Sequence, residues 1–518
     1  MAHISDKRFA LVLGLITLLG ASLRMYHLGH RSLWLDETFS FAYISRSWEA
    51  ILTNPVLMKE ASELNPPLYF VFLSGWTALF GVSEFSLRSL SVVFGVIAII
   101  LTGLIGSFLY DRRTGLLAAL FMAVMVFPLR YSQEARGYAL FLMLALASFY
   151  FCVRCLQKGQ ARDWFAYLGI TVALSYTHTY WVFLVLAQNL YVLLFYWAER
   201  VTLLRWIGIQ TVVTLCFLPW LPQFFAQVEE ATHGQFWLQQ PSSPIHDFRF
   251  HILIGTLLNY VSFLAPSRIV WAYLVLAVIA TLCITVAGSG FHWRNLRKSL
   301  ESYTWEIRID DVQRSSFLLL WLVCSLGVPF FLSHFTHVYF HPRYAIAAVP
   351  ALYLLLARGV WQIPTNFGRG AIGLFIAVIS LTSLQRYYER GGQKEPWREW
   401  VTYLTQQTEP EDVVVVFPNY ASIPVEYYAK GSLEYHILPK VDKQALVTNS
   451  IGSLLDEWAR GRKHLWFVAH LVPGQKSTPI LEYLRNHYQL DTIDSAVQHR
   501  GNPTILRFEI AEYSKPKT

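Results

Sequence analysis

Charged residues are scarce in this sequence, because Asp, Glu, Lys and Arg together make up only 15% of its 518 residues. Soluble proteins carry about a quarter, so the composition excludes an ordinary soluble protein. Hydrophobic residues make up 54%, and apolar runs of about 20 residues, long enough to cross a bilayer, recur along the chain. The composition therefore predicts a polytopic α-helical membrane protein.

Cysteines are also few, and all five lie in apolar segments, so no disulfide framework is indicated. Cys152 and Cys155 have the spacing of a redox pair. That motif requires a βαβ context, however, and here the pair lies in a hydrophobic segment with an arginine between its members. A redox function is therefore not favoured.

The net charge is +8, and it is best explained by basic cytoplasmic loops that fix the orientation of the chain in the membrane. We therefore expect membrane lipid, and no nucleic acid, as a partner. The first apolar stretch, residues 9–23, could be a signal peptide, but we interpret it as a retained span. Alternation of apolar and basic segments then predicts about eleven spans. Two shorter apolar pieces, residues 65–81 and 252–264, are interpreted as interfacial helices.

The composition becomes polar after residue 390, which predicts a change of domain. We expect a transmembrane domain at residues 1–390, with a long first outer loop at 26–88, and a soluble extracytoplasmic α/β domain at 391–518. Strands are predicted at residues 413–417, 465–469 and 504–510, and helices at 397–405, 453–460 and 479–488. This domain carries no glycine-rich or Walker motif that would mark a nucleotide site.

Two adjacent carboxylates, Asp36 and Glu37, lie in the first outer loop between apolar and aromatic residues. An acid near a membrane surface is costly to desolvate and therefore needs partners or a task. Neighbouring side chains diverge by about 100° on a helix. We expect one of the two acids to face a cavity and the other to cap nearby backbone. The alternative is a helix N-terminus with a favourable acidic first turn.

Further polar residues from at least four separate segments are expected on the same outer side of the membrane. They are Arg88, Glu134, Arg136, Tyr138, His178, Tyr180, His337, His341, Arg343 and Tyr344. Taken singly, an interfacial arginine more often snorkels from a helix end. His334, His337 and His341 would share a helix face and could bind a metal, although ordinary hydrogen-bonded histidines are the more common outcome. Their convergence indicates a functional cavity.

These motifs resemble the GT-C glycosyltransferases, in the branch of protein O-mannosyltransferases, aminoarabinose transferases and bacterial Rgt-type enzymes. The resemblance covers residues 1–390 and is carried by Asp36-Glu37, Asn65-Pro66-Pro67-Leu68-Tyr69, the Arg88 segment, Ser132-Gln133-Glu134-Ala135-Arg136-Gly137-Tyr138 and Pro342-Arg343-Tyr344. One departure is Gly137, which stands where many relatives carry proline.

The resemblance implies inverting transfer of a sugar from a polyprenyl-phosphate donor to a hydroxyl of a protein, lipid or surface glycan. Asp36 would be the catalytic base, with Glu37 beside it and Glu134 as the second acid. The implied substrate-binding residues are Arg343, Arg136 and Arg88 for the departing phosphate, and Tyr138, Tyr344, His178 and Tyr180 for phosphate or sugar. Some relatives use a divalent cation and others none, so a cation is allowed but not required.

The resemblance also implies a bacterial inner-membrane protein whose active site and C-terminal domain face outward. Two other functions fit a polytopic membrane protein. A transporter of a glycolipid or anionic solute would more often show internal repeats or broken paired helices, and the sequence indicates neither. A membrane-anchored binding module would not need so many spans.

Overall fold

The computed structural model describes residues 4–46, 51, 66–225, 250–261, 309–334, 340–363, 365–390, 395–438, 450–470, 479–492 and 504–510. The chain divides into two compact units. The first, here called the helical unit, comprises Met1–Leu28 and Leu64–Gly392. The second, the α/β unit, comprises Gly29–Glu63 and Gln393–Thr518, so it includes the segment that carries Asp36 and Glu37.

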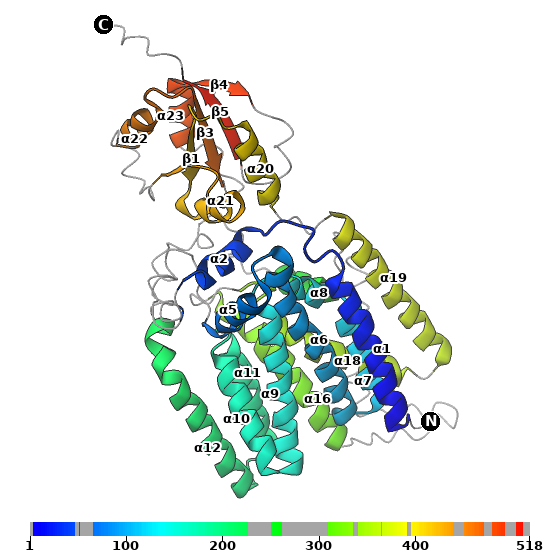
Figure 1. Cartoon of the computed structure of the whole chain (residues 1–518). Coiled ribbons are helices and arrows are strands. Elements are labelled where there is room, and N and C mark those ends of the chain that lie inside the picture. The colour runs from blue at the N-terminus through cyan, green and yellow to red at the C-terminus, as the bar shows by residue number, and fades with distance from the viewer. Residues whose placement is uncertain are drawn as a thin grey trace. The chain divides into compact units, whose positions relative to one another are not determined.

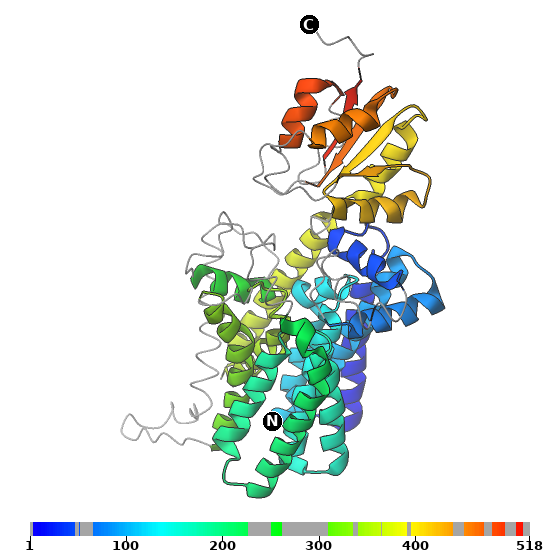
Figure 2. The same cartoon turned by 90° about the vertical axis from the view of Figure 1, so that its left-hand side faces the viewer.

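The helical unit is a bundle of apolar helices (Figures 1 and 2). Its described helices are α1 (Asp6–Met25), α5 (Leu68–Phe80), α6 (Glu84–Leu109), α7 (Arg112–Val124), α8 (Val126–Ser132), α9 (Tyr138–Lys158), α10 (Ala161–Ser175), α11 (Trp181–Phe195), α12 (Arg200–Phe217), α14 (Phe250–Val261), α16 (Ile309–Leu322), α17 (Val328–Leu332), α18 (Val349–Gln362) and α19 (Asn366–Arg390). Helix α9 packs against both α6 and α10, and α10 packs against α12. The prediction of a polytopic helical membrane protein is confirmed.

The expected number of about eleven spans is not confirmed. Within the described residues, six helices are long and apolar enough to cross a membrane, or seven if one bent pair counts as a single span. Several of the expected spans, among them α11 and α18, are helices of 14 or 15 residues. The span expected at residues 269–288 lies outside the described residues. The two pieces interpreted as interfacial are indeed short, as α5 and α14.

Ion pairs and a helix cap connect neighbouring helices at one end of the bundle. The Asp111 carboxylate caps α7 by accepting hydrogen bonds from the backbone N–H groups of Arg113 (3.0 Å) and Thr114 (2.9 Å). Asp111 also pairs with Arg358 at 3.4 Å, and Arg154 pairs with Asp163 at 2.9 Å. This is the end whose loops carry the basic residues, and its assignment to the cytoplasm stays a prediction.

A sharp break separates α7 from α8, which are bent by 59° at Met125. The sequence predicts one continuous span that ends near residue 128, and it indicates no broken helix. The structure corrects both predictions, because this segment is two helices joined at a bend. Arg24 supplies hydrogen-bond donors to the backbone at this break. Its guanidinium donates to the carbonyl oxygens of Met122 (2.8 Å) and Ala123 (3.0 Å) and to Ser132 Oγ (3.1 Å). These carbonyls end α7 and would otherwise lack a donor.

Space for Arg24 comes from a glycine on the neighbouring helix. A Cβ atom at Gly95 in α6 would lie 2.1 Å from Ser132 Oγ and 3.1 Å from Arg24 Nε. Arg24 is completely buried, and within the described residues its guanidinium donates to these carbonyl and hydroxyl oxygens and to the Gly20 carbonyl at 3.1 Å. A buried guanidinium must have such partners, because its desolvation is costly.

We expect the substitution Arg24→Met to lower the free energy of unfolding by about 2 kcal/mol or more, because carbonyls at the break lose their donor. The measurement is thermal unfolding of the purified protein in detergent. Arg8→Met, an exposed position on the same helix, is the control and should leave the midpoint nearly unchanged. Equal midpoints for Arg24→Met and wild type would contradict this account of the break.

The α/β unit contains a five-stranded sheet in the order β2-β1-β3-β5-β4. Its strands are β1 (Val413–Phe417), β2 (His436–Ile437), β3 (His464–Ala469), β4 (Gln489–Thr492) and β5 (Thr504–Glu509). Strand β1 runs parallel to β2 and β3, whereas β5 runs antiparallel to β3 and β4. The described helices are α2 (Leu35–Ile44), α20 (Trp397–Gln407), α21 (Ser422–Ala429), α22 (Ser450–Ala459) and α23 (Pro479–His487).

Alternating side chains of the strands build two cores, one on each face of the sheet. Val413 and Val415 pack with α22 and α23, while Val414 and Val416 pack with α20 and α21. This is the period of two that a strand imposes. All three expected strands and all three expected helices are present, with small changes at their ends. The sequence pattern does not predict β2, β4 and α21, because these elements are short.

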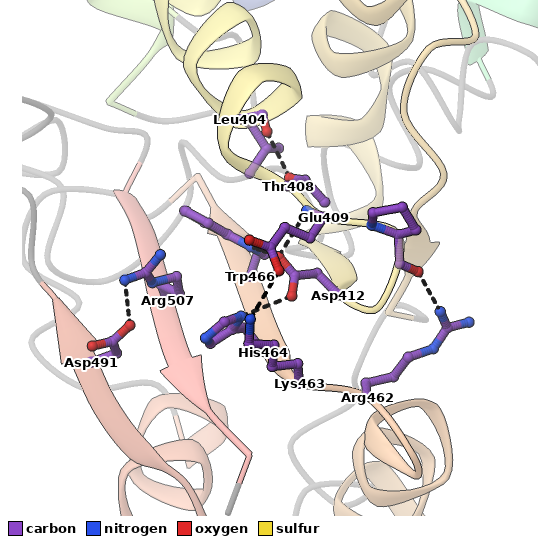
Figure 3. Close-up of polar contacts among 11 residues, drawn as sticks. Leu404, Thr408, Glu409, Asp412, Arg462, Lys463, His464, Trp466, Asp491 and Arg507 are labelled. Atoms are coloured by element: carbon purple, nitrogen blue, oxygen red, sulfur yellow. Dashed lines mark hydrogen bonds and ion pairs between the residues drawn. The ribbon is translucent and has the colours of Figure 1, made fainter.

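A buried carboxylate closes the turn between α20 and β1 (Figure 3). Asp412 accepts hydrogen bonds from His464 Nδ1 (2.8 Å), Trp466 Nε1 (2.9 Å) and the backbone N–H of Glu409 (3.1 Å). Burial raises the pKa of Asp412, but the hydrogen bonds from Trp466, Glu409 N–H and His464 outweigh it, so the pKa is lowered overall. The charged form therefore stabilises the folded unit.

A lowered carboxylate pKa means that Asp412 stabilises the fold above its ordinary pKa of 3.8 and that this contribution is lost as the pH falls through the folded value. We expect Asp412→Asn to cost about 1–3 kcal/mol at pH 7. The difference from wild type should shrink below the ordinary pKa. Thermal unfolding at pH 7 and pH 3 measures both. Glu409→Gln, which removes only an exposed ion pair with Lys463, is the control.

Candidate active site

An aromatic cluster gathers four of the expected substrate-binding residues in the helical unit. Tyr138 is the first residue of α9, His178 and Tyr180 lie in the turn between α10 and α11, and Tyr344 precedes α18. The ring of Tyr344 lies 5.2 Å from that of His178, 5.8 Å from that of Tyr180 and 6.2 Å from that of Tyr138, measured between centroids. The structure thus brings together residues from three separate segments that the sequence analysis grouped.

Arg343 lies at this aromatic cluster as well. Its guanidinium carbon is 5.3 Å from the ring centroid of Tyr344 and 5.9 Å from that of Tyr138. The backbone on either side is fixed by Tyr260 of α14, whose hydroxyl donates to the carbonyls of Pro342 (3.1 Å) and Ala345 (2.9 Å). The position of Arg343 is therefore set by a hydrogen-bonded turn and by two aromatic faces.

The second expected acid, Glu134, is almost completely buried, with 1% of its surface exposed. Its Oε1 accepts a hydrogen bond from Arg130 Nε at 3.3 Å, while no described residue hydrogen-bonds its Oε2. Arg130 was not among the expected site residues. The signal for it was its spacing of four from Glu134 at the end of a helix, which is a common arrangement for an ion pair.

The loop after α8 is tied to neighbouring segments by side-chain hydrogen bonds. The side-chain amide of Gln133 donates to the carbonyls of Arg24 (2.8 Å) and Tyr26 (2.9 Å), and it accepts from the hydroxyl of Tyr387 (2.8 Å). The Ser91 hydroxyl donates to the carbonyl of Arg136 at 3.3 Å. These contacts make the loop that carries Glu134 and Arg136 a well-defined part of the fold.

The proline-containing motif packs directly against this loop. Its last residue, Tyr69, hydrogen-bonds Ser91, and the backbone N–H of Leu68 donates to the carbonyl of Tyr176 at 3.0 Å. A Cβ at Gly137 would lie 3.3 Å from Cβ of Tyr69, so a larger residue there would press on the tyrosine. Asn65 lies outside the described residues. Two motifs far apart in the sequence therefore meet at one place.

Arg88 is buried in α6 and donates from Nη1 to the carbonyl of Leu28 at 2.9 Å. This contact fixes the backbone at the last residue before the chain leaves the helical unit. The contact gives Arg88 a structural task, and its expected contribution to phosphate binding stays a prediction.

His178 is a neutral hydrogen-bond donor in a positively charged environment. It is 3% exposed, and burial together with the charges of Arg136 and Arg343 lowers its pKa to about 3. Its Nδ1 accepts from the backbone N–H of Tyr180 at 3.2 Å, so the ring proton resides on Nε2. Among the described residues, Nε2 has no hydrogen-bond partner.

His341 repeats this arrangement. Its Nδ1 accepts from the backbone N–H of Arg343 at 3.2 Å. Burial and the charges of Arg343 and Arg130 lower its pKa well below the ordinary value. The charges of Arg136 and Arg343 beside neutral imidazoles are suited to binding an anion, whereas Arg130 is paired with Glu134.

His334 and His341, the two described members of the expected histidine face, do not lie on a common helix. Helix α17 ends at Leu332, and His341 lies outside any helix, where the turn before α18 begins. His337 lies outside the described residues. The part of the chain that the structure describes contains no group of three or more His, Cys, Asp or Glu side chains that could hold a metal ion.

Asp36 and Glu37 belong to the α/β unit, in the first turn of α2. Glu37 is completely buried and accepts from the backbone N–H of Trp34 at 3.3 Å, so its side chain caps the N-terminus of α2. Asp36 is half-buried. The helix N-terminus with an acidic first turn, considered above as the alternative, is thus the local structure. The catalytic assignments of both acids stay predictions.

Comparison with known proteins gives one family match and several structural ones. Residues 64–223 match the family model described as dolichyl-phosphate-mannose-protein mannosyltransferase. No curated protein matches the sequence. The structure resembles ArnT from Cupriavidus metallidurans bound to undecaprenyl phosphate, with 12% identity over 97% of this chain and 98% of that one and a TM-score of 0.56.

A second structural match is the archaeal oligosaccharyltransferase AglB from Archaeoglobus fulgidus in complex with an inhibitory peptide and a dolichol-phosphate. It is 14% identical over 93% of this chain and 72% of that one, with a TM-score of 0.51. The fold is that of the GT-C glycosyltransferases. The resemblance noted from the motifs is thereby confirmed, and the GT-C fold together with the apolar helices makes the chain an integral membrane protein.

The environment of His178 predicts an acid-sensitive fold. Because the folded pKa of about 3 lies below the ordinary 6.5, His178 stabilises the fold fully above pH 6.5, and the contribution is lost as the pH falls. Between pH 7 and pH 5 we expect a loss of about 2 kcal/mol from this residue. Thermal unfolding of His178→Asn should show a correspondingly weaker pH dependence. His487→Asn, at an exposed position, should retain the wild-type dependence, and an unchanged slope in His178→Asn would contradict the prediction.

Proposed function

We propose that this protein is a glycosyltransferase that moves a sugar from a polyprenyl-phosphate-linked donor to an acceptor hydroxyl, with inversion at the sugar carbon. The GT-C fold supports this function, as does the family model matched by residues 64–223. Two similar structures, ArnT and AglB, hold undecaprenyl phosphate and dolichol-phosphate respectively. Fold alone does not assign chemistry, so the proposal depends on the site.

The observation that carries the proposal is the cationic and aromatic cluster around His178. Arg136 and Arg343 are close enough to lower the pKa of His178, and His178 presents a donor N–H that no described residue accepts. Guanidinium groups bind phosphate through two parallel hydrogen bonds, and a neutral imidazole adds a third donor. Negative charge that builds on a departing phosphate would be stabilised by such preorganised donors.

The proposed reaction is a single displacement. The acceptor oxygen attacks the anomeric carbon, the bond from that carbon to the phosphate oxygen breaks, and the acceptor proton passes to the Asp36 carboxylate. The leaving group is the polyprenyl phosphate, whose charge Arg343 and Arg136 would neutralise. Tyr138, Tyr180 and Tyr344 offer hydroxyl groups and ring faces for the sugar.

The two other acids have different tasks in this proposal. Glu37 caps α2 and thereby fixes the helix on which Asp36 lies. Glu134 is paired with Arg130 and has a second, buried oxygen that could orient the acceptor. A lipid-linked donor also fits an active site on the outer side of a bacterial inner membrane, because nucleotide sugars are made in the cytoplasm. The acceptor would be a protein, a lipid or a surface glycan.

We expect Asp36→Asn to lower kcat by about 10²-fold or more, because asparagine keeps the shape and removes the base. Binding of the donor should be unchanged. The measurement is turnover of purified protein with radiolabelled polyprenyl-phosphate sugars, together with donor binding. Asp6→Asn, at a position where 91% of the side chain is exposed, should keep wild-type turnover.

Full activity of Asp36→Asn would exclude Asp36 as the base. Absence of transfer by the wild type, tested across hexosyl and pentosyl donors, would contradict the proposed function as a whole. Loss of donor binding in Asp36→Asn would show that the residue binds substrate and does not act in the chemical step.

A further inference from the structure

The segment that leads into α2 is fixed by residues from the far end of the chain, within the α/β unit. The Ser32 hydroxyl donates to the carbonyl of Glu395 at 2.8 Å, and the backbone N–H of Leu33 donates to the hydroxyl of Tyr428 at 2.6 Å. Arg398 donates to the carbonyls of His30 (3.1 Å) and Gly29 (3.3 Å). Residues 29–33 therefore form hydrogen bonds with partners that are more than 350 residues away in the sequence.

The decisive contact is made by the Glu395 side chain at the start of α2. Its Oε2 accepts from the backbone N–H of Leu35 at 3.0 Å, and Leu35 is the first residue of the helix. The first N–H groups of a helix have no partner within it, and a carboxylate there is also favoured by the helix dipole. Glu395 thus caps α2 from outside, while Glu37 caps it from within.

Glu395 is itself locked in place. The same Oε2 accepts from Nε1 of the completely buried Trp397 at 2.7 Å, and Oε1 lies 3.1 Å from His470 Nε2. The His470 ring stacks on Trp397 with 6.2 Å between centroids. A carboxylate bound from three sides has little rotamer freedom, so it fixes the N–H that it accepts.

Aromatic pairs hold the remainder of α2 against α21 and against the short 3-10 turn Asn419–Ala421 that precedes it. The ring of Phe41 lies 4.8 Å from that of Tyr427, and the ring of Phe39 lies 6.4 Å from that of Tyr420, both pairs in edge-to-face arrangement. Asp36 is the residue directly after Leu35. Its position is therefore defined by the capping contact on one side and the aromatic contacts on the other.

We propose that Glu395 and Tyr428 are positioning residues for Asp36, and that the α/β unit serves the reaction by holding α2 in place. The inference rests on the proposed function, in which Asp36 is the base. Catalysis depends on placing the base within hydrogen-bond reach of the acceptor, and small displacements of a catalytic group reduce the rate strongly. The proposal gives the C-terminal part of the chain a task in the transfer reaction.

The test uses the full-length protein and three variants of the cap, Glu395→Ala, Glu395→Gln and Tyr428→Phe. We expect Glu395→Ala to speed amide hydrogen exchange in a peptide covering residues 30–44 by about tenfold, because a charge-assisted hydrogen bond is lost. The kcat should fall by about tenfold while the donor KM changes less than about twofold, since the donor contacts are untouched.

Glu395→Gln keeps an oxygen that can accept from Leu35 N–H, so it should restore most of both readouts. Tyr428→Phe removes one hydrogen bond and keeps the ring, which gives a milder variant if Glu395→Ala fails to fold. Glu409→Ala is the matched control, because this glutamate of the same unit pairs with the exposed Lys463. Its exchange rates in residues 30–44 and its kcat should equal those of the wild type.

Unchanged exchange in residues 30–44 for folded Glu395→Ala and Tyr428→Phe would overturn the proposal. Faster exchange with unchanged kcat would overturn it too, because the contact would then be structural only. The proposed function fails separately, through absence of transfer by the wild type, and the assignment of Asp36 as the base fails through an active Asp36→Asn. The hydrogen-exchange result does not depend on turnover, so the two failures can be told apart.

Discussion

Charge buried in an apolar bundle is the constraint on which this structure depends. A guanidinium removed from water needs oxygen partners, and the helical unit supplies them by exposing backbone. Arg24 takes the carbonyls freed by the break between α7 and α8, and Arg88 takes the carbonyl of Leu28. Arg136 and Arg343 lie close enough to the buried His178 that their charges, together with burial, keep this histidine neutral by lowering its pKa.

The groups proposed for proton transfer and for phosphate binding belong to different compact units. Asp36 is on α2 in the α/β unit, whereas Arg136, His178 and Arg343 are in the helical unit. The two kinds of group have different structural requirements. Cations that lie near one another must be held by packing against their mutual repulsion, and they attract an anion more strongly where water is excluded. A base at a helix N-terminus needs caps that fix the helix.

Much of the fold could be predicted, because apolar runs and strand alternation are local signals. The run of valines in β1 is apolar on both sides of the strand, as a strand buried on both faces requires. The alternation of spans placed Tyr138, His178, Tyr180, Arg343 and Tyr344 on one side of the membrane, and the structure brings them together. The break at Met125 could not be predicted. Pro128 lies in the first turn of α8, where proline is tolerated, and the carbonyls before it depend on Arg24 about 100 residues away. The cap that Glu395 forms on α2 could not be predicted either, since its partner Leu35 is 360 residues away in the sequence.

The α/β unit is a discontinuous domain, because its residues come from both Gly29–Glu63 and Gln393–Thr518. Polypeptide passes between the two units three times, after Leu28, after Glu63 and after Gly392. A chain that stopped at Gly392 would therefore lose more than an appended tail. It would keep α2 and its internal cap Glu37, but it would lose the sheet, helices α20 to α23 and the external cap that Glu395 supplies.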